Sequence, residues 1–336
     1  MPIMPGQMPE TCAGPQRKVS CKVSSKPSSG VSSTPVQSRS RSGVMLRVIS
    51  AGLFVVMSLF VRLASAEAPV GQIVFYRSAF ALPPIIAYLM WRRQFPSALR
   101  TRQPVGHLKR NLYGGAAMVL SFISLAYLPL ALATALGFLA PLLAVPAAML
   151  FLRERPGAVA IGAALTGFAG VVLMLAPAFE GPALDHDTII GVAAGLAMAV
   201  ATAAGRVEIK ALTATEAPGT IAFYFALLCA LGGLASAPFG WVTPGGLSLV
   251  WLVGAGMTGG LAHITMTEAM ARASVSTQAP FDYTAMLWAL ILDAAIFGLL
   301  PSPLSLAGAC VIAASALVVP LADRFTGRLE ALRATR

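Results

Sequence analysis

Four ionisable side chains inside long apolar runs of the sequence are candidates for chemistry, namely Arg77, His263, Asp282 and Asp293. A charged group at the centre of a membrane-spanning helix costs about 2.5–3.5 kcal/mol. Groups kept at that cost are by default candidates for binding a substrate or an ion. Arg77 could bind an anionic group of a substrate or pair with an acid on another helix. Its alternative role is structural, satisfying backbone carbonyls at a helix break.

The two acids and the histidine indicate proton or cation chemistry. Asp282 and Asp293 could each relay a proton or contact a cationic substrate, and Asp293 lies deep in its apolar run with no loop nearby. Asp282 lies near the start of the same run, and its alternative role is that of an interfacial or helix N-terminal carboxylate. His263 could instead donate a hydrogen bond to a carbonyl of a neighbouring helix.

The elements that must position these residues follow from the composition. Of 336 residues, 57% are hydrophobic and 11% are charged, whereas a soluble domain has about 45–50% apolar and about 25% charged residues. So little charge cannot cover a water-facing surface, which excludes an ordinary soluble enzyme. A helix needs about 20 apolar residues to span a bilayer. Ten apolar runs fit this requirement: 45–63, 70–91, 110–128, 130–152, 157–176, 188–205, 219–238, 248–270, 278–299 and 304–322.

The net charge of +11 is explained by the loops between these runs rather than by nucleic-acid binding. The loop after every even-numbered run is basic, whereas the loops after odd-numbered runs carry acids or almost no charge. Arg110 and Arg206 are both assigned to basic loops by this count. Basic loops stay in the cytoplasm. The pattern predicts a multi-pass protein of a bacterial inner membrane, surrounded by lipid, with both termini cytoplasmic.

The chain divides into two similar halves with a tail at each end. Residues 1–43 are rich in Ser, Pro and basic residues and predict a disordered tail, either a basic segment on anionic lipid or an extension upstream of a start at Met45. The halves are 44–178 and 186–322, and a cytoplasmic tail covers 323–336. The segment EAPVGQIVFY at 67–76 opens the second run, and the similar EAPGTIAFY at 216–224 opens the seventh.

This repeat spans five runs, and because five is odd the second copy must be inserted upside down. Inverted repeats of this kind are typical of secondary transporters, whose substrate site lies near the midplane where the halves meet. The predicted fold is therefore an all-α membrane protein with ten transmembrane helices arranged as two inverted five-helix repeats.

The sequence resembles EamA-type transporters of the drug/metabolite transporter superfamily over roughly residues 45–320. Four stretches carry the likeness: PVGQIVFYR (69–77); SLAYLPL (124–130) running on to ATALGFLAP (133–141); LRER (152–155) with GFAGV (167–171); and APFDYT (279–284) with LWA (287–289) and FG (297–298). The chain departs from the family pattern at three positions. Leu299 stands where a Glu is frequent, Asp282 where a neutral polar residue is common, and Asp293 where a small residue is expected.

The resemblance implies further site residues, because the third, fourth, eighth and ninth spans line the central cavity in this family. Aromatic side chains on these spans could stack on a flat organic substrate or pack the core, and they are Tyr127, Phe138, Tyr283 and Trp288. Proline interrupts helical hydrogen bonding, so bends are expected at four positions: Pro129, Pro141, Pro146 and Pro280.

The predicted function is a secondary transporter that moves a small organic metabolite, such as an amino acid, nucleoside or vitamin, by alternating access. Its partners would be that substrate and either protons or a counter-substrate. No sequence motif indicates ATP binding or hydrolytic catalysis, and no Cys or His spacing indicates a metal, so neither enzyme activity nor a cofactor is expected. The alternative is a polytopic membrane receptor or assembly scaffold that transports nothing.

Overall fold

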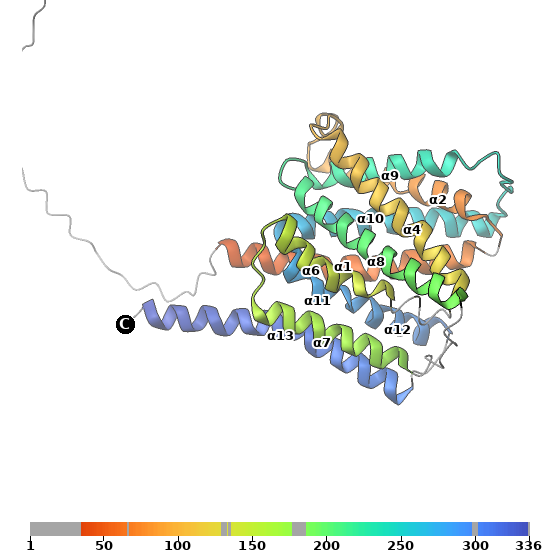
Figure 1. Ribbon diagram of the computed structural model, residues 1–336. Coiled ribbons are helices and arrows are strands. Elements are labelled where there is room, and N and C mark those ends of the chain that lie inside the picture. Colours follow the sequence, from red (N-terminus) through yellow and green to blue (C-terminus); the bar gives the residue numbers. More distant parts are fainter. Residues whose placement is uncertain are drawn as a thin grey trace, which may run out of the picture. The chain divides into compact units, whose positions relative to one another are not determined.

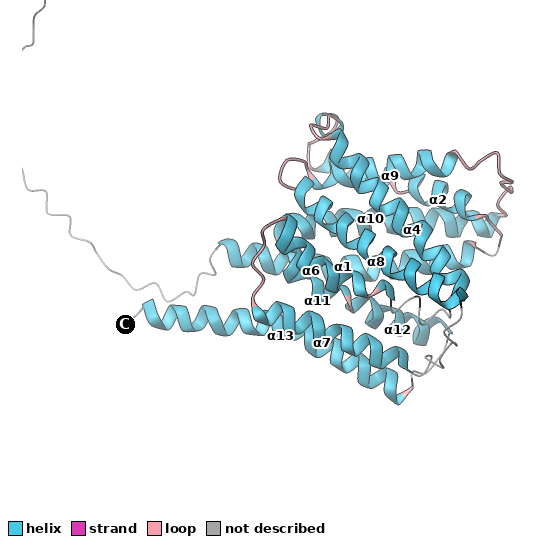
Figure 2. Cartoon of the chain, viewed as in Figure 1, coloured by secondary structure: helices cyan, strands magenta, loops and turns pink. Residues whose placement is uncertain are grey.

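The computed structural model describes residues 35–65, 67–128, 133, 136–176, 186–297 and 302–334, and these form α-helices joined by turns, with no strand among them (Figure 2). They belong to one compact unit, Pro35–Arg336. The helices are α1 (Pro35–Ala64), α2 (Val70–Ala79), α3 (Leu82–Trp91), the 3-10 turn η1 (Ser97–Leu99), α4 (Pro104–Tyr127), α6 (Leu139–Phe151), α7 (Ala158–Leu175), α8 (His186–Leu212), α9 (Pro218–Leu234), α10 (Gly246–Arg272), α11 (Val275–Asp282), α12 (Thr284–Phe297) and α13 (Pro303–Ala334).

These helices confirm an all-α membrane protein. Five helical segments are long and apolar enough to cross a bilayer: Arg41–Ala64, Val70–Trp91, His186–Leu212, Gly246–Arg272 and Val275–Ile296. Four shorter apolar helices accompany them, at Leu139–Phe151, Ala158–Leu173, Pro218–Leu234 and Pro303–Val318. Two of the predicted runs are each divided into two helices, 70–91 into α2 and α3 and 278–299 into α11 and α12. That ten segments cross the membrane stays a prediction.

The helices at both ends of the unit extend beyond the predicted spans. Helix α1 begins at Pro35, so residues 35–43 are helical rather than part of a disordered tail, and α13 continues through the predicted C-terminal tail to Ala334. Ser, Arg, Leu and Glu all have acceptable helix propensity, so a polar sequence can continue a helix that an apolar span has nucleated. Residues 1–34 lie outside the described residues.

Close packing at α10 depends on residues without side chains. Gly254 and Gly259 of α10 lie against Phe60 and Met57 of α1, whereas Gly256 and Gly260 lie against the junction of α2 and α3. A methyl group at Gly260 would come within 2.6 Å of the carbonyl oxygen of Ala81. Small residues let membrane helices approach closely, and the helix pairs α1–α10, α2–α9, α4–α8 and α7–α13 are packed side by side (Figure 1).

The proline positions have different consequences. Pro280 lies inside α11, which ends two residues later, so the break between α11 and α12 follows this proline. Pro141 lies in the first turn of α6, where backbone N–H groups have no helical acceptor in any case, so this proline does not have to bend the helix. Pro146 lies inside α6, which continues past it. Pro129 lies outside the described residues.

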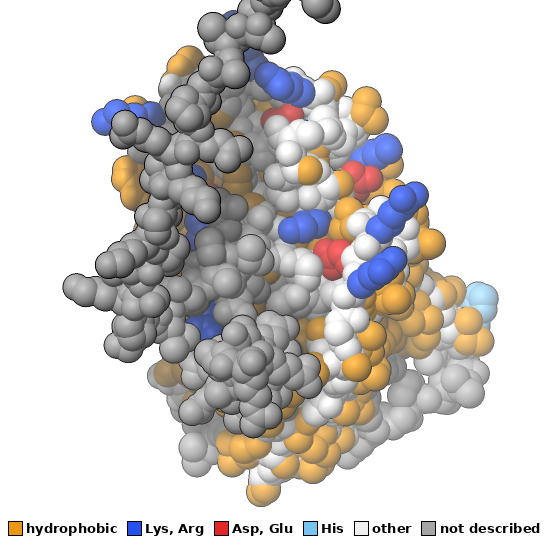
Figure 3. Space-filling view, turned by 90° about the vertical axis from the view of Figure 1, so that its left-hand side faces the viewer, with side chains coloured by type: hydrophobic (Ala, Val, Ile, Leu, Met, Phe, Trp, Pro, Cys, Tyr) orange, Lys and Arg blue, Asp and Glu red, His pale blue; other side chains and the backbone are white. Residues whose placement is uncertain are grey.

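One end of the helical unit is basic. The loops that follow α3, α6 and α8 lie at the left-hand end in Figure 1, where the described chain also begins and ends. Figure 3 faces this end and shows Lys and Arg side chains gathered on it. Exposed cations of the α3–α4 and α6–α7 segments are Arg92, Arg93, Arg100, Arg102, Lys109, Arg153 and Arg155. Arg110 and Arg206 differ from these exposed cations, because they lie inside α4 and α8 rather than in the predicted loops and their side chains are largely buried.

Candidate functional site

A cavity of about 390 Å³ lies between helices from both halves of the chain. Its walls come from α1, α4, α8, α11, α12, the start of α6 and the segment that leads into it. Apolar side chains dominate the walls, and charged groups occupy one part. The lining residues are Arg47, Ala51, Phe54, Ser121, Ala133, Gly137, Phe138, Ala140, Pro141, Met198, Thr202, Arg206, Asp282 and Ala285.

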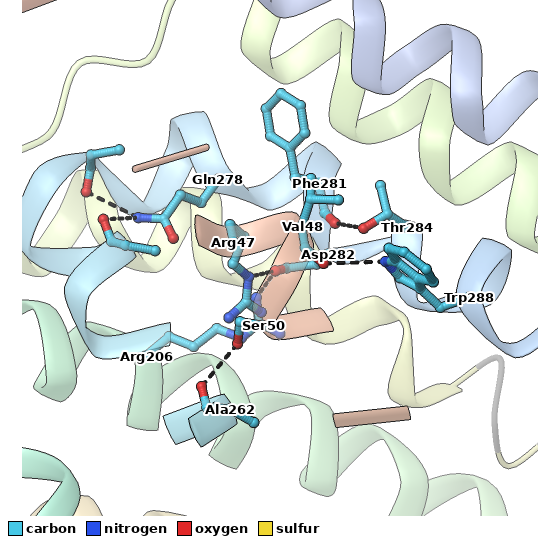
Figure 4. Close-up of polar contacts among 12 residues, drawn as sticks. Arg47, Val48, Ser50, Arg206, Ala262, Gln278, Phe281, Asp282, Thr284 and Trp288 are labelled. Carbon is cyan, nitrogen blue, oxygen red and sulfur yellow. Dashed lines mark hydrogen bonds and ion pairs between the residues drawn. The ribbon is translucent and has the colours of Figure 1, made fainter. Parts of the chain in front are cut away.

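The charged part of the cavity is a carboxylate held between two guanidinium groups (Figure 4). Asp282 accepts a hydrogen bond at Oδ1 from Nε of Arg47, and its Oδ2 forms an ion pair with Nη1 of Arg206. The Asp282 side chain is 3% exposed, and the Arg47 and Arg206 side chains are 7% and 15% exposed. Asp282 is the last residue of α11, so the interpretation of this residue as a carboxylate in the first turn of a helix is wrong.

Helix α11 is only eight residues long and is held at its beginning by two side chains. The Ser274 hydroxyl caps the helix by accepting from the backbone N–H of Thr277. Glu154, from the loop between α6 and α7, accepts from the backbone N–H groups of Val275 and Ser276 at 3.0 and 3.1 Å and from the Ser276 hydroxyl at 2.7 Å. An anionic group is favourable at a helix N-terminus because the free N–H groups and the helix dipole attract it.

Further hydrogen bonds connect the neighbouring helices around the cluster (Figure 4). The amide of Gln278 donates from Nε2 to two carbonyl groups near the end of α10, at 3.1 Å each. Ser50 of α1 donates to the Ala262 carbonyl of α10 at 3.1 Å, and Trp288 of α12 donates from Nε1 to the Val48 carbonyl of α1 at 3.2 Å. These contacts fix α1, α10, α11 and α12 relative to one another, and thereby place Arg47 opposite Asp282.

The four predicted aromatic residues are distributed differently. Phe138 lines the cavity. Tyr283 is fully buried behind it and packs with Val171 and Ile312 in an apolar cluster that Phe138 also contacts. Trp288 serves as the α12–α1 contact already described, whereas Tyr127 is 44% exposed at the end of α4.

Arg77 and His263 lie together, apart from the charged cluster. Both line a second, very small cavity of about 10 Å³ together with Phe225. The guanidinium carbon of Arg110 lies 3.7 Å from the centre of the Phe225 ring, a cation–π contact. The His263 ring lies 4.7 Å from Phe225 and 5.0 Å from Phe54. No carboxylate pairs with Arg77 in the part of the chain that the structure describes.

Further charged residues lie on α10 and α12. Glu268 and Arg272, four residues apart on α10, form an ion pair at 2.7 Å, as their spacing predicts. Asp293 lies in α12, and its side chain is not among the described atoms, so its role as a proton relay stays a prediction.

Arg47 and Arg206 are the cluster residues that the sequence analysis missed. Arg47 is in the apolar run 45–63 and qualified as an intramembrane charge. Arg206 comes directly after the run 188–205 and was assigned to a loop, although α8 continues to Leu212. The available signal was the helix-forming sequence beyond that run, which has no Gly or Pro between Arg206 and Leu212.

Comparison with known proteins decides the family. The EamA-like transporter family matches residues 41–176. A riboflavin transporter of Vibrio cholerae is 30% identical over 80% of this chain and 90% of its own length. The chain belongs to the EamA family. A pseudopaline exporter of Pseudomonas aeruginosa is 28% identical over 83% of this chain and 96% of its own, and an S-adenosylmethionine uptake transporter of Rickettsia felis is 25% identical over 83% and 92%.

The EamA assignment agrees with the fold. One crystal structure is similar to this chain with a TM-score of 0.73 at 23% sequence identity, covering 85% of this chain and 99% of the other. These EamA relatives are named as transporters rather than enzymes, and their named substrates differ in size and chemistry. The protein is accordingly an integral, multi-pass membrane protein of a transporter family.

Proposed function

We propose that this protein is a secondary transporter that moves a small organic metabolite across the bacterial inner membrane by alternating access. The observation that carries the proposal is the cavity of about 390 Å³, whose walls come from both halves of the chain and which contains the cluster of Arg47, Arg206 and Asp282. A binding site between two repeats can open to either side when one repeat rocks against the other. A proton gradient or exchange for a counter-substrate would drive the movement.

The proposed architecture has ten spans in two inverted repeats, 44–178 and 186–322. Helix packing supports it. In this architecture each helix of the first repeat corresponds to one of the second: α1 to α8, α4 to α10, and α6 to the α11–α12 pair. When the two repeats are interchanged, the contact between α1 and α10 corresponds to the contact between α8 and α4. The contact between α6 and α8 likewise corresponds to the contact between α12 and α1. All four contacts are present.

The repeated EAP segments support the inversion more directly. Gly71, at the start of α2, lies against Ser236, just after the end of α9, whereas Gly219, at the start of α9, lies against Leu89 near the end of α3. The two repeated segments therefore run antiparallel.

The glutamates of the two EAP segments occupy corresponding places. Glu216 accepts from the backbone N–H of Arg102 at 2.7 Å, just before α4 begins. Glu67 lies beside Gly245, the residue that precedes α10. Exchange of the halves relates α4 to α10, so the repeated acid lies at equivalent helix starts.

Transport in purified vesicles tests the function. Liposomes containing the protein should accumulate or exchange at least one compound of an isotopically labelled mixture of amino acids, nucleosides and vitamins, relative to protein-free liposomes. Thr202→Trp should abolish this flux because Thr202 lines the cavity and the indole ring would fill it. Val200→Trp on the same helix is the control, because Val200 is 58% exposed and faces away. A receptor or scaffold would show no flux in either variant or in the wild type.

Reporter fusions test the ten-span topology. A reporter fused after Arg93 should lie in the cytoplasm, because the α3–α4 segment carries the exposed cations Arg92, Arg100 and Arg102 and basic loops stay inside. A reporter fused after Asp185 should lie in the periplasm. Alkaline phosphatase and green fluorescent protein fusions distinguish the two sides. Both reporters on one side would exclude this topology.

A further inference from the structure

The cavity carries a surplus of positive charge. Its charged lining consists of two guanidinium groups, Arg47 and Arg206, and one carboxylate, Asp282. The carboxylate can neutralise one guanidinium, so one positive charge remains uncompensated in the described lining. Arginine stays protonated in proteins, so this charge cannot be removed by loss of a proton.

The surplus charge is buried, and part of it has no partner. Both oxygens of Asp282 are engaged, one by Arg47 and one by Arg206. Nη1 of Arg47 is inaccessible to solvent and has no hydrogen-bond acceptor among the described residues. Burial of an unpaired charge is strongly unfavourable, so an anion that enters the cavity gains a charge partner.

The rest of the lining indicates what accompanies that anion. Phe54, Phe138 and Met198 provide apolar wall, and the hydroxyl groups of Ser121 and Thr202 lie among them. A cavity of about 390 Å³ is far larger than the share of liquid volume of one water molecule, about 30 Å³. A chloride or phosphate ion would leave most of this apolar volume unfilled, whereas an organic anion would occupy it.

We propose that the cavity binds an organic anion whose carboxylate lies against Arg47 and Arg206 and whose apolar body packs on Phe54 and Phe138. The planar guanidinium fork matches a carboxylate with two parallel hydrogen bonds. The bound anion shares the two arginines with Asp282, so the occupied cluster is electrically neutral. This inference deepens the proposed transport function and rests on it.

The test compares pairs of compounds that differ only in charge. Liposomes containing the wild-type protein are given a labelled library of aromatic and aliphatic carboxylates, each with its neutral amide, for example indole-3-acetate and indole-3-acetamide, together with matched amines. Carboxylates should dominate the accumulated compounds, and each corresponding amide should accumulate about 10- to 100-fold less, as expected for loss of a charge-assisted hydrogen bond. A transported carboxylate should also protect the detergent-purified protein against thermal unfolding, and its amide should not.

Substitutions test whether Arg47 and Arg206 cause the preference for carboxylate over amide. Arg47→Gln and Arg206→Gln should each remove the preference for carboxylate over amide, whereas Arg206→Lys, which keeps the charge but not the planar fork, should retain part of it. Arg155→Gln is the control, because Arg155 is exposed in the α6–α7 loop and does not line the cavity. Protection against thermal unfolding by the carboxylate, measured in each variant that folds, reports ligand binding independently of transport.

Three outcomes would overturn the proposal. Selective movement of amides or amines would exclude an anion site while leaving the transport function intact. Flux of chloride or phosphate alone would show that the arginines serve an inorganic ion. Movement of no compound by the wild-type protein would refute the proposed transport function itself, and the anion proposal with it.

Discussion

Asp282→Asn is expected to lower the free energy of unfolding of the protein by about 3–5 kcal/mol. The asparagine keeps the size of the side chain but removes the only carboxylate in the described cavity lining, so Arg47 and Arg206 would face one another without a counter-charge. Removal of one partner from a buried ion pair is costly because the remaining charged group stays desolvated without an ion-pair partner. Thermal or denaturant unfolding of the detergent-purified protein, followed by tryptophan fluorescence, measures the change.

A second substitution distinguishes charge repulsion from a general packing defect. Arg47→Gln in the Asp282→Asn background leaves Arg206 as the single cation, restoring the net charge of the wild-type cluster. We expect the double variant to regain part of the lost stability, so that the two substitutions are not additive. Glu67→Gln is the comparison for loss of an exposed acid outside the cluster, and it should cost much less stability than Asp282→Asn. Wild-type stability in Asp282→Asn would contradict the ion-pair cluster.

Glu154→Ala is expected to cost about 1.5–3 kcal/mol of stability, the typical value of hydrogen bonds to a charged group. The carboxylate accepts from the backbone of Val275 and Ser276 and from the Ser276 hydroxyl. Without it, the first N–H groups of α11 lose their acceptor, and the helix that ends in Asp282 loses its anchor to the α6–α7 loop. Flux should therefore fall together with stability.

Glu154→Gln provides the matched comparison, because the amide keeps one oxygen acceptor but loses the charge. It should fall between the wild type and Glu154→Ala in both unfolding and flux. Arg155→Gln, one residue further and exposed, should change neither. Equal stability of Glu154→Ala and the wild type would show that the Ser274 cap alone holds the start of α11.

The sequence by itself determined the helical class, the membrane setting and the positions of the apolar segments. These follow from composition and run length, because the hydrocarbon thickness of a bilayer fixes how many apolar residues a helix needs. The EAP repeat at 67–69 and 216–218 could also be recognised in the sequence, and its two copies lie at the starts of α2 and α9. The Glu268–Arg272 pair was predictable because it depends only on helical geometry within α10.

Only the tertiary structure decided which polar groups meet. Asp282 pairs with Arg47, which is 235 residues away in sequence, and Arg206 belongs to a helix rather than to the loop that its charge suggested. In a soluble helix the polar face reveals which side is buried. Here lipid and protein core are both apolar, so the sequence carries little record of how each helix is rotated. That rotation places Phe138 on the cavity wall, Tyr283 behind it and Tyr127 at the surface.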